Sequence, residues 1–133
     1  MLGLDLDVLR VFLHVRAATV WVGGQLVLGA LVPALRAVAP EAPGAAARQF
    51  EKVAWPAFAV LVATGIWNVA QVPDQVGEEY RRTLLLKLLA VLLSGATALV
   101  HARATTPRQR AVFGALTGVT ALAALLLGVL LGR

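Results

Sequence analysis

Residues 84–100 read LLLKLLAVLLSGATALV, and this run decides the class of fold. It contains one charged side chain, Lys87, among apolar, small and hydroxyl-bearing residues. About 20 such residues in a helix cross the ~30 Å hydrocarbon layer of a bilayer. A lysine at the centre of that layer costs about 2.5–3.5 kcal/mol, and less near the interface. Lys87 therefore either extends its amine to the headgroups or interacts with a partner or ligand within the membrane.

The composition points to the same class of protein. Hydrophobic residues make up 59% of the chain and charged residues 14%, whereas a soluble domain carries about 25% charged residues. The absence of cysteine excludes disulfides and thiolate metal sites, and the single methionine, Met1, excludes a series of thioether ligands. The net charge is +5, but the basic residues gather at the ends of the apolar segments. We therefore expect a lipid bilayer as partner and no nucleic acid.

Four apolar segments have membrane-spanning length and predict helices at residues 11–35, 53–72, 83–101 and 111–131. The connections, residues 36–52, 73–82 and 102–110, are short, which makes successive helices antiparallel neighbours. We predict an all-α, integral membrane, up-down four-helix bundle that forms one domain over residues 1–133. Ala37-Val38-Ala39 resembles a signal-peptidase site. However, the preceding Asp5 and Asp7 and the length of the first segment favour a retained helix.

The distribution of basic residues predicts the orientation. Six lysines and arginines lie at the first and third connections, and four lie on the other side: Arg10, Arg81, Arg82 and Arg133. Basic residues are enriched in cytoplasmic loops. We therefore expect both termini outside a bacterial-type plasma (inner) membrane.

Polar side chains are predicted to gather at one end of the bundle. His14 and Lys87 lie near the starts of the first and third segments, which run in the same direction. The second segment runs the other way and reaches that end with Thr64 and Asn68, one turn apart. The predicted ligand-binding residues are His14, Arg16, Trp21, Gly24, Thr64, Asn68 and Lys87.

His101 is predicted to lie apart from this cluster. Lys87, Ser94 and His101 recur every seven residues and share one helix face. His101 is fourteen residues beyond Lys87, which is about 21 Å along the helix. His14 and His101 therefore cannot both ligate one metal ion in a monomer, and His101 is a candidate for a weak, separate metal site. For all these residues, extension to the headgroups or hydrogen bonding between helices remains an alternative.

Several motifs resemble two related membrane families. Leu13-His14, Trp21-Val22-Gly23-Gly24 and Pro33-Ala34-Leu35-Arg36 are similar to the first helix of CopD-type copper-resistance membrane domains and of HemJ-type protoporphyrinogen oxidases. Residues 50–56 and 63–66 resemble their second helix, and residues 84–101 their third. In the HemJ type, a first-helix histidine and a third-helix lysine are implicated in haem b binding. The resemblance assigns these roles to His14 and Lys87, whereas the CopD type implies copper movement across the membrane.

The residues and the resemblance together predict a haem b-binding membrane protein with a redox or haem-handling role. His14 would be an axial iron ligand, Lys87 the second ligand or a propionate contact, and Arg16 a propionate contact. A redox partner, an oxidoreductase activity of the protoporphyrinogen oxidase type, and a homo-oligomer are open expectations. One alternative is copper transport, with His14 and His101 at the two ends of the path. Another is a cofactor-free bundle that binds a partner.

Overall fold

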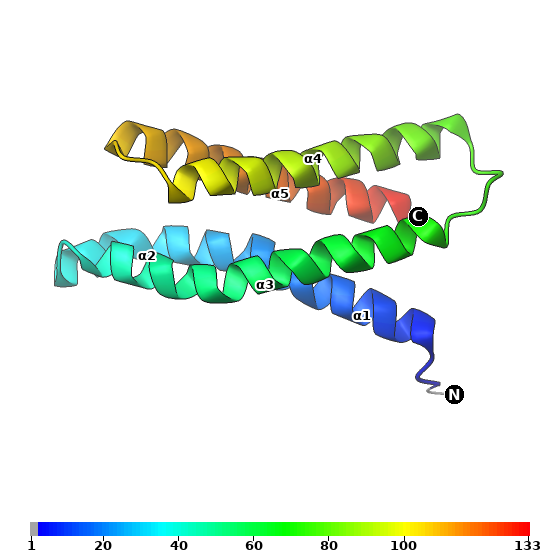
Figure 1. Ribbon diagram of the computed structural model, residues 1–133, viewed down its shortest axis with the longest axis horizontal. Coiled ribbons are helices and arrows are strands. Elements are labelled where there is room, and N and C mark those ends of the chain that lie inside the picture. Colours follow the sequence, from blue (N-terminus) through cyan, green and yellow to red (C-terminus); the bar gives the residue numbers. More distant parts are fainter. Residues whose placement is uncertain (1–2) are drawn as a thin grey trace. The chain divides into compact units, whose positions relative to one another are not determined.

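The computed structural model describes residues 3–133, which fold almost entirely into helices. The chain divides into two compact units, Met1–Val72 and Pro73–Arg133. Each unit is an antiparallel pair of long helical segments (Figure 1). All four segments are long and apolar enough to cross a membrane. The prediction of an all-α membrane bundle is therefore confirmed.

The first crossing of unit 1 is a continuous helix with one irregular turn. It comprises α1 (Leu6–Ala18), the π-helical turn η1 (Thr19–Gly23) and α2 (Gly24–Val38). The Asp5 side chain caps the first turn by accepting a 2.8 Å hydrogen bond from the Val8 amide. π-Turns within α-helices are rare and often lie at functional sites.

The second crossing of unit 1 is α3 (Ala42–Ala70), which packs antiparallel to the first. Three contacts show the antiparallel arrangement, because the residue numbers rise along the first crossing as they fall along α3. His14 faces Thr64, Trp21 faces Phe58, and Gly24 faces Phe50. The glycine is needed for close approach, because a Cβ on Gly24 would lie 2.7 Å from Cζ of Phe50.

The helix α3 begins well before the apolar segment that predicts it. Residues 42–52 are helical, so the connection between α2 and α3 is limited to residues 39–41. Hydropathy marks where contact with lipid ends, whereas backbone hydrogen bonding decides where a helix ends. Pro43 in the first turn is compatible with a helix start, because the first amides of a helix have no partner within it.

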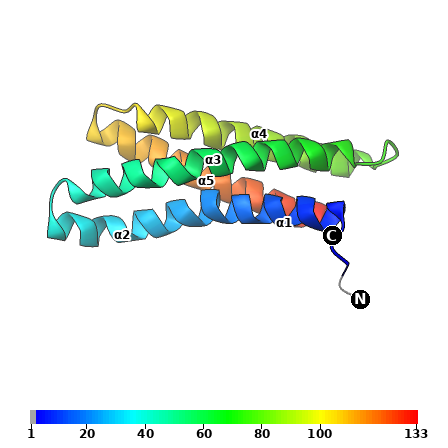
Figure 2. The same ribbon diagram turned by 60° about the horizontal axis from the view of Figure 1, so that its bottom comes forward.

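Unit 2 is the hairpin of α4 (Glu78–Ala102) and α5 (Pro107–Leu131), which lie side by side in both views (Figures 1 and 2). Thr106 caps α5 by accepting a 3.2 Å hydrogen bond from the Gln109 amide, and Pro107 occupies the first turn. The short connection, residues 103–106, fixes the two helices as antiparallel neighbours.

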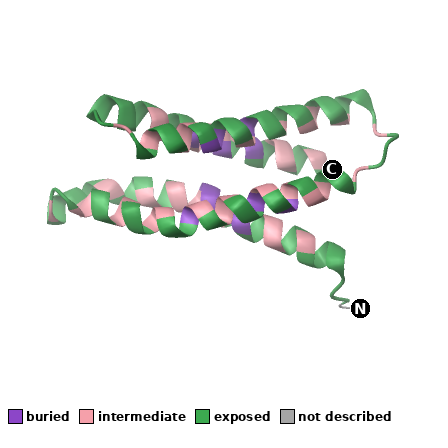
Figure 3. Cartoon of the chain, in the orientation of Figure 1, coloured by how far each residue is buried: buried purple, intermediate pink, exposed green. Residues whose placement is uncertain are grey.

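Many large apolar side chains of the four crossings are exposed, and the green ribbon of Figure 3 marks the exposed residues. Leu85 and Leu92 on α4, Leu126 on α5 and Ile66 on α3 are each more than 60% exposed. Lipid tails are the environment in which such side chains are stable. The chain is therefore an integral membrane protein.

Candidate functional site

His14 on α1 and Thr64 on α3 meet within unit 1. The distance between Nδ1 of His14 and Oγ1 of Thr64 is 2.9 Å. Thr64 is buried and His14 is half-buried. The imidazole also packs on the backbone beside Thr64, since a Cβ on Gly65 would lie 3.6 Å from Cε1 of the ring. The structure thus brings together two residues of the predicted cluster.

The Thr64 hydroxyl lies within hydrogen-bonding distance of both the Val60 carbonyl oxygen and Nδ1 of His14. When it donates to the Val60 carbonyl oxygen, 2.7 Å away, its oxygen accepts from Nδ1 of His14. Neutral His14 is then protonated on Nδ1 and carries its lone pair on Nε2. Metal-binding histidines are usually oriented by such a bond from the other ring nitrogen. This arrangement makes Nε2 the atom suited to a metal ion.

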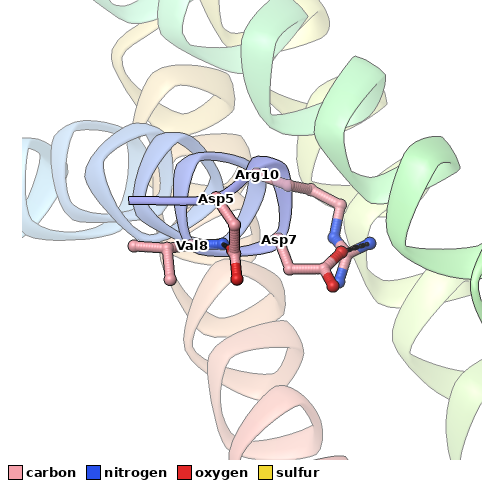
Figure 4. A network of polar contacts seen from close by, with 4 residues as sticks. All are labelled: Asp5, Asp7, Val8 and Arg10. Carbon is pink, nitrogen blue, oxygen red and sulfur yellow. Dashed lines mark hydrogen bonds and ion pairs between the residues drawn. The ribbon is translucent and has the colours of Figure 1, made fainter. Parts of the chain in front are cut away.

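Arg10 lies one turn before His14 on the same face of α1. Its guanidinium forms a 2.9 Å ion pair with Asp7 (Figure 4) and lies 5.9 Å from the centroid of the Trp67 ring. Its Nε is buried and has no hydrogen-bond partner within residues 3–133. The sequence predicts Arg10 only as a charge at the membrane boundary, although its i, i+4 spacing to His14 places both residues on one face of the helix.

Arg16 lies on another side of α1. Two residues along a helix correspond to a rotation of roughly 200°, so Arg16 and His14 cannot share a face. Arg16 and Lys52 line a groove of about 360 Å³ between the two crossings of unit 1. The other groove residues are apolar: Leu13, Ala17, Val20, Val53, Pro56, Ala57 and Val60.

Trp21 belongs to an aromatic cluster. Its ring centroid lies 5.4 Å from that of Trp55 and 4.4 Å from that of Phe58. Only 3% of Trp21 is exposed, so its ring is packed among other side chains. Asn68 lies one turn beyond Thr64 and is half-buried. The roles of Trp21, Gly24 and Asn68 as walls of a ligand pocket stay predictions.

In unit 2, Lys87 and His101 both lie on the α4 face that packs on α5. A Cβ on Gly128 would lie 3.2 Å from Nζ of Lys87, and one on Gly114 would lie 3.1 Å from Cε1 of His101. Between these two contacts, the Ser94 hydroxyl donates a 3.1 Å hydrogen bond to the Thr117 carbonyl. Lys87, Ser94 and His101 therefore lie on one face of α4, as their seven-residue spacing predicts, and this face contacts α5.

The imidazole of His101 also has a defined tautomer. Its Nδ1 lies 2.8 Å from the Arg110 carbonyl oxygen, which can only accept a hydrogen bond. Nδ1 must therefore carry the proton, and neutral His101 carries its lone pair on Nε2. Each unit thus contains one histidine whose Nε2 is the nitrogen suited to a metal ion.

The predicted pairing of His14 with Lys87 stays a prediction, because the two residues belong to different units. Within residues 3–133, the structure contains no group of three or more His, Cys, Asp or Glu side chains arranged to hold a metal ion. A metal ion at either histidine would therefore take its remaining ligands from other donor types, from water or from a partner.

Comparison with known proteins supplies the family. No curated protein and no solved structure matches the chain. A family model described as copper resistance protein D matches residues 44–132, about two-thirds of the chain. The matched part contains Thr64, Lys87 and His101, whereas His14 precedes it. The chain belongs to the copper resistance protein D (CopD) family of integral membrane proteins.

Proposed function

We propose that this protein handles copper ions at the membrane and that His14 and His101 bind them as nitrogen ligands. Copper is the cargo in this proposal. The observation that carries it is the 2.9 Å hydrogen bond between Nδ1 of His14 and Oγ1 of Thr64, which orients the imidazole in the way that metal-binding histidines are usually oriented. The membership in the CopD family supports copper as the ion.

The donor chemistry supports an exchangeable site. Imidazole is a good ligand for copper, and the sequence offers no cysteine and only one methionine as sulfur donors. One imidazole in each unit leaves most coordination positions to water or to a donor from another molecule. Such a site binds weakly enough to release its ion, which transfer across a membrane requires.

The expected topology supports transfer. If the chain crosses the membrane four times as the sequence predicts, His14 is near the outer face and His101 near the cytoplasmic face. The proposed sequence of events is binding at His14 and release at His101.

Copper flux into proteoliposomes tests this proposal. We expect His14→Ala and His101→Ala each to lower Cu²⁺ uptake at least tenfold, and Gln75→Ala, in the exposed connection between α3 and α4, to leave it unchanged. Uptake equal to that of the original protein in both histidine variants would contradict copper handling by these residues.

Haem b is the second candidate, and the single oriented imidazole of unit 1 favours it. A porphyrin supplies four nitrogen ligands, so one histidine is enough to attach it to a protein. His14 would hold the iron through Nε2, and Lys87 would be the second ligand or a propionate contact. Arg10 offers a further donor for a carboxylate, since its buried Nε has no partner within residues 3–133. When bound, haem would supply one-electron redox chemistry.

The optical spectrum separates the two candidates. Haem binding predicts a Soret band in the detergent-purified protein after addition of hemin. The band should be lost in His14→Ala and shifted in Lys87→Ala. A spectrum identical to that of free hemin in detergent would exclude haem and leave copper handling unaffected.

A further inference from the structure

We infer that Gly114 is a positioning residue for His101, which is thereby held as a copper ligand separate from His14. This inference rests on the proposed copper handling, but its geometric part can be tested without any metal. All the residues that carry it lie in unit 2, on α4 and α5.

The imidazole of His101 lies directly on the backbone of α5. A Cβ on Gly114 would lie 3.1 Å from Cε1 and 3.2 Å from Nδ1 of the ring, closer than ordinary van der Waals contact. Gly114 and Arg110 are four residues apart, so they lie one above the other on the same face of α5. The ring therefore occupies the space that the missing side chain leaves and reaches the Arg110 carbonyl from there.

The contact with Gly114 constrains the orientation of the His101 ring as well as its position. Because Nδ1 is bonded to the Arg110 carbonyl oxygen at 2.8 Å, a shift of the ring by a few tenths of an ångström lengthens this bond. The bond fixes the tautomer, and with it the lone pair on Nε2. Loss of such a supporting bond typically weakens metal binding 10–100-fold.

Lys87 approaches Gly128 nearly as closely as His101 approaches Gly114, but its side chain is less constrained. A Cβ on Gly128 would also come close, 3.2 Å from Nζ of Lys87. However, Nζ is the end of a flexible chain with several rotatable bonds, so it can move away at little cost. The His101 ring has no such freedom, because a hydrogen bond holds one of its edges.

Gly118 provides a matched control on the same helix. It lies one turn after Gly114, and a Cβ there would meet nothing within 4 Å. The two glycines also form a Gly-x-x-x-Gly motif. In membrane helices this motif often lies at the contact between the helices of a dimer. If the glycines served a dimer, both substitutions would lower the oligomeric mass.

The experiment uses the full chain, purified in detergent without a histidine tag, with His14→Ala present throughout. His101 is then the only histidine, so ¹⁵N-histidine labelling gives the NMR signals of one imidazole. We expect the Nδ1–H tautomer in this parent and in Gly118→Ala, and a mixed or Nε2–H population in Gly114→Ala. Cu²⁺ titration should show 10–100-fold weaker binding for Gly114→Ala and less than a twofold change for Gly118→Ala.

The outcomes are distinguishable. An unchanged tautomer and copper affinity in Gly114→Ala would overturn the inference. An equal loss of affinity in both glycine variants, with a fall in oligomeric mass, would overturn it in favour of a dimer contact. A tautomer change in Gly114→Ala, with no copper bound by the parent, would establish the positioning of the ring and contradict the proposed copper function at His101.

Discussion

Thr64 determines which nitrogen of His14 can face a ligand. When its hydroxyl donates to the Val60 carbonyl of its own helix, it offers an acceptor to Nδ1, and neutral His14 then carries its lone pair on Nε2. Thr64 is therefore as important to the proposed site as the histidine, although it would not touch the metal.

Substitution of Thr64 tests this relation. Thr64→Val keeps the shape of the side chain but removes the hydroxyl, so we expect the copper affinity at His14 to fall 10–100-fold. Thr64→Ser retains the hydroxyl and should stay within about threefold of the original protein. Both affinities are measured by Cu²⁺ titration with His101→Ala present, so that only His14 contributes. Equal affinities for the valine and serine variants would contradict the role of the hydroxyl.

The sequence predicts part of this site. Antiparallel crossings and residue counting place His14 and Thr64 at one end of unit 1, and the structure has them in contact. Arg16 lies two residues after His14 and therefore on nearly the opposite side of the helix, and its role as a propionate contact stays a prediction. Helical spacing favours Arg10 instead. The tautomer of His14 is not predictable from sequence, because it depends on how the Thr64 hydroxyl is oriented.

At the scale of the helix pair, Gly24 permits the close packing of unit 1. A Cβ there would overlap the Phe50 ring, whereas one on the neighbouring Gly23 would meet nothing within 4 Å. We expect Gly24→Ala to lower the free energy of unfolding by about 1–3 kcal/mol through overpacking. Gly23→Ala should be neutral or stabilising by up to about 1 kcal/mol, because alanine favours helix.

Equilibrium unfolding in mixed detergent micelles measures both glycine variants. If Gly23→Ala were as destabilising as Gly24→Ala, the helix itself, and not its contact with Phe50, would require glycine at these positions.

In unit 2, hydroxyl groups join α4 to α5. Ser94 is 1% exposed and donates to the Thr117 carbonyl across the hairpin. Hydrogen bonds between membrane helices contribute about 0.6 kcal/mol on average and at most about 1.7 kcal/mol. We expect Ser94→Ala to lower the stability of the protein by an amount in this range. Thr120→Ala is the control, since its hydroxyl bonds only within α5, and it should change stability less than Ser94→Ala in the same unfolding assay.

For the whole molecule, the sequence predicts the number of crossings but not the lengths of the helices. Hydropathy identifies four spans because lipid requires apolar side chains over about 20 residues. It does not detect residues 42–52, in which small and charged residues keep the hydropathy low and which nevertheless extend α3. The pairing of His14 with Lys87 stays a prediction, because it joins residues of two different units.

The predicted orientation follows from the basic residues and can be tested with single cysteines, because the chain contains none. We expect Gln75→Cys, between α3 and α4, to react with a membrane-impermeant maleimide in intact cells. Glu41→Cys and Thr105→Cys, in the other two connections, should react only after the cells are opened. The reverse pattern would place both termini in the cytoplasm and exchange the proposed roles of His14 and His101.

The central claim is that Nε2 of His14 is a copper ligand, and electron paramagnetic resonance of the Cu²⁺-loaded protein tests it most directly. The full chain is purified without a histidine tag and compared with His14→Ala, both with His101→Ala present. We predict superhyperfine coupling from one imidazole nitrogen in the protein that retains His14, and its loss in His14→Ala. An identical spectrum and an identical amount of bound copper in the two proteins would contradict the claim.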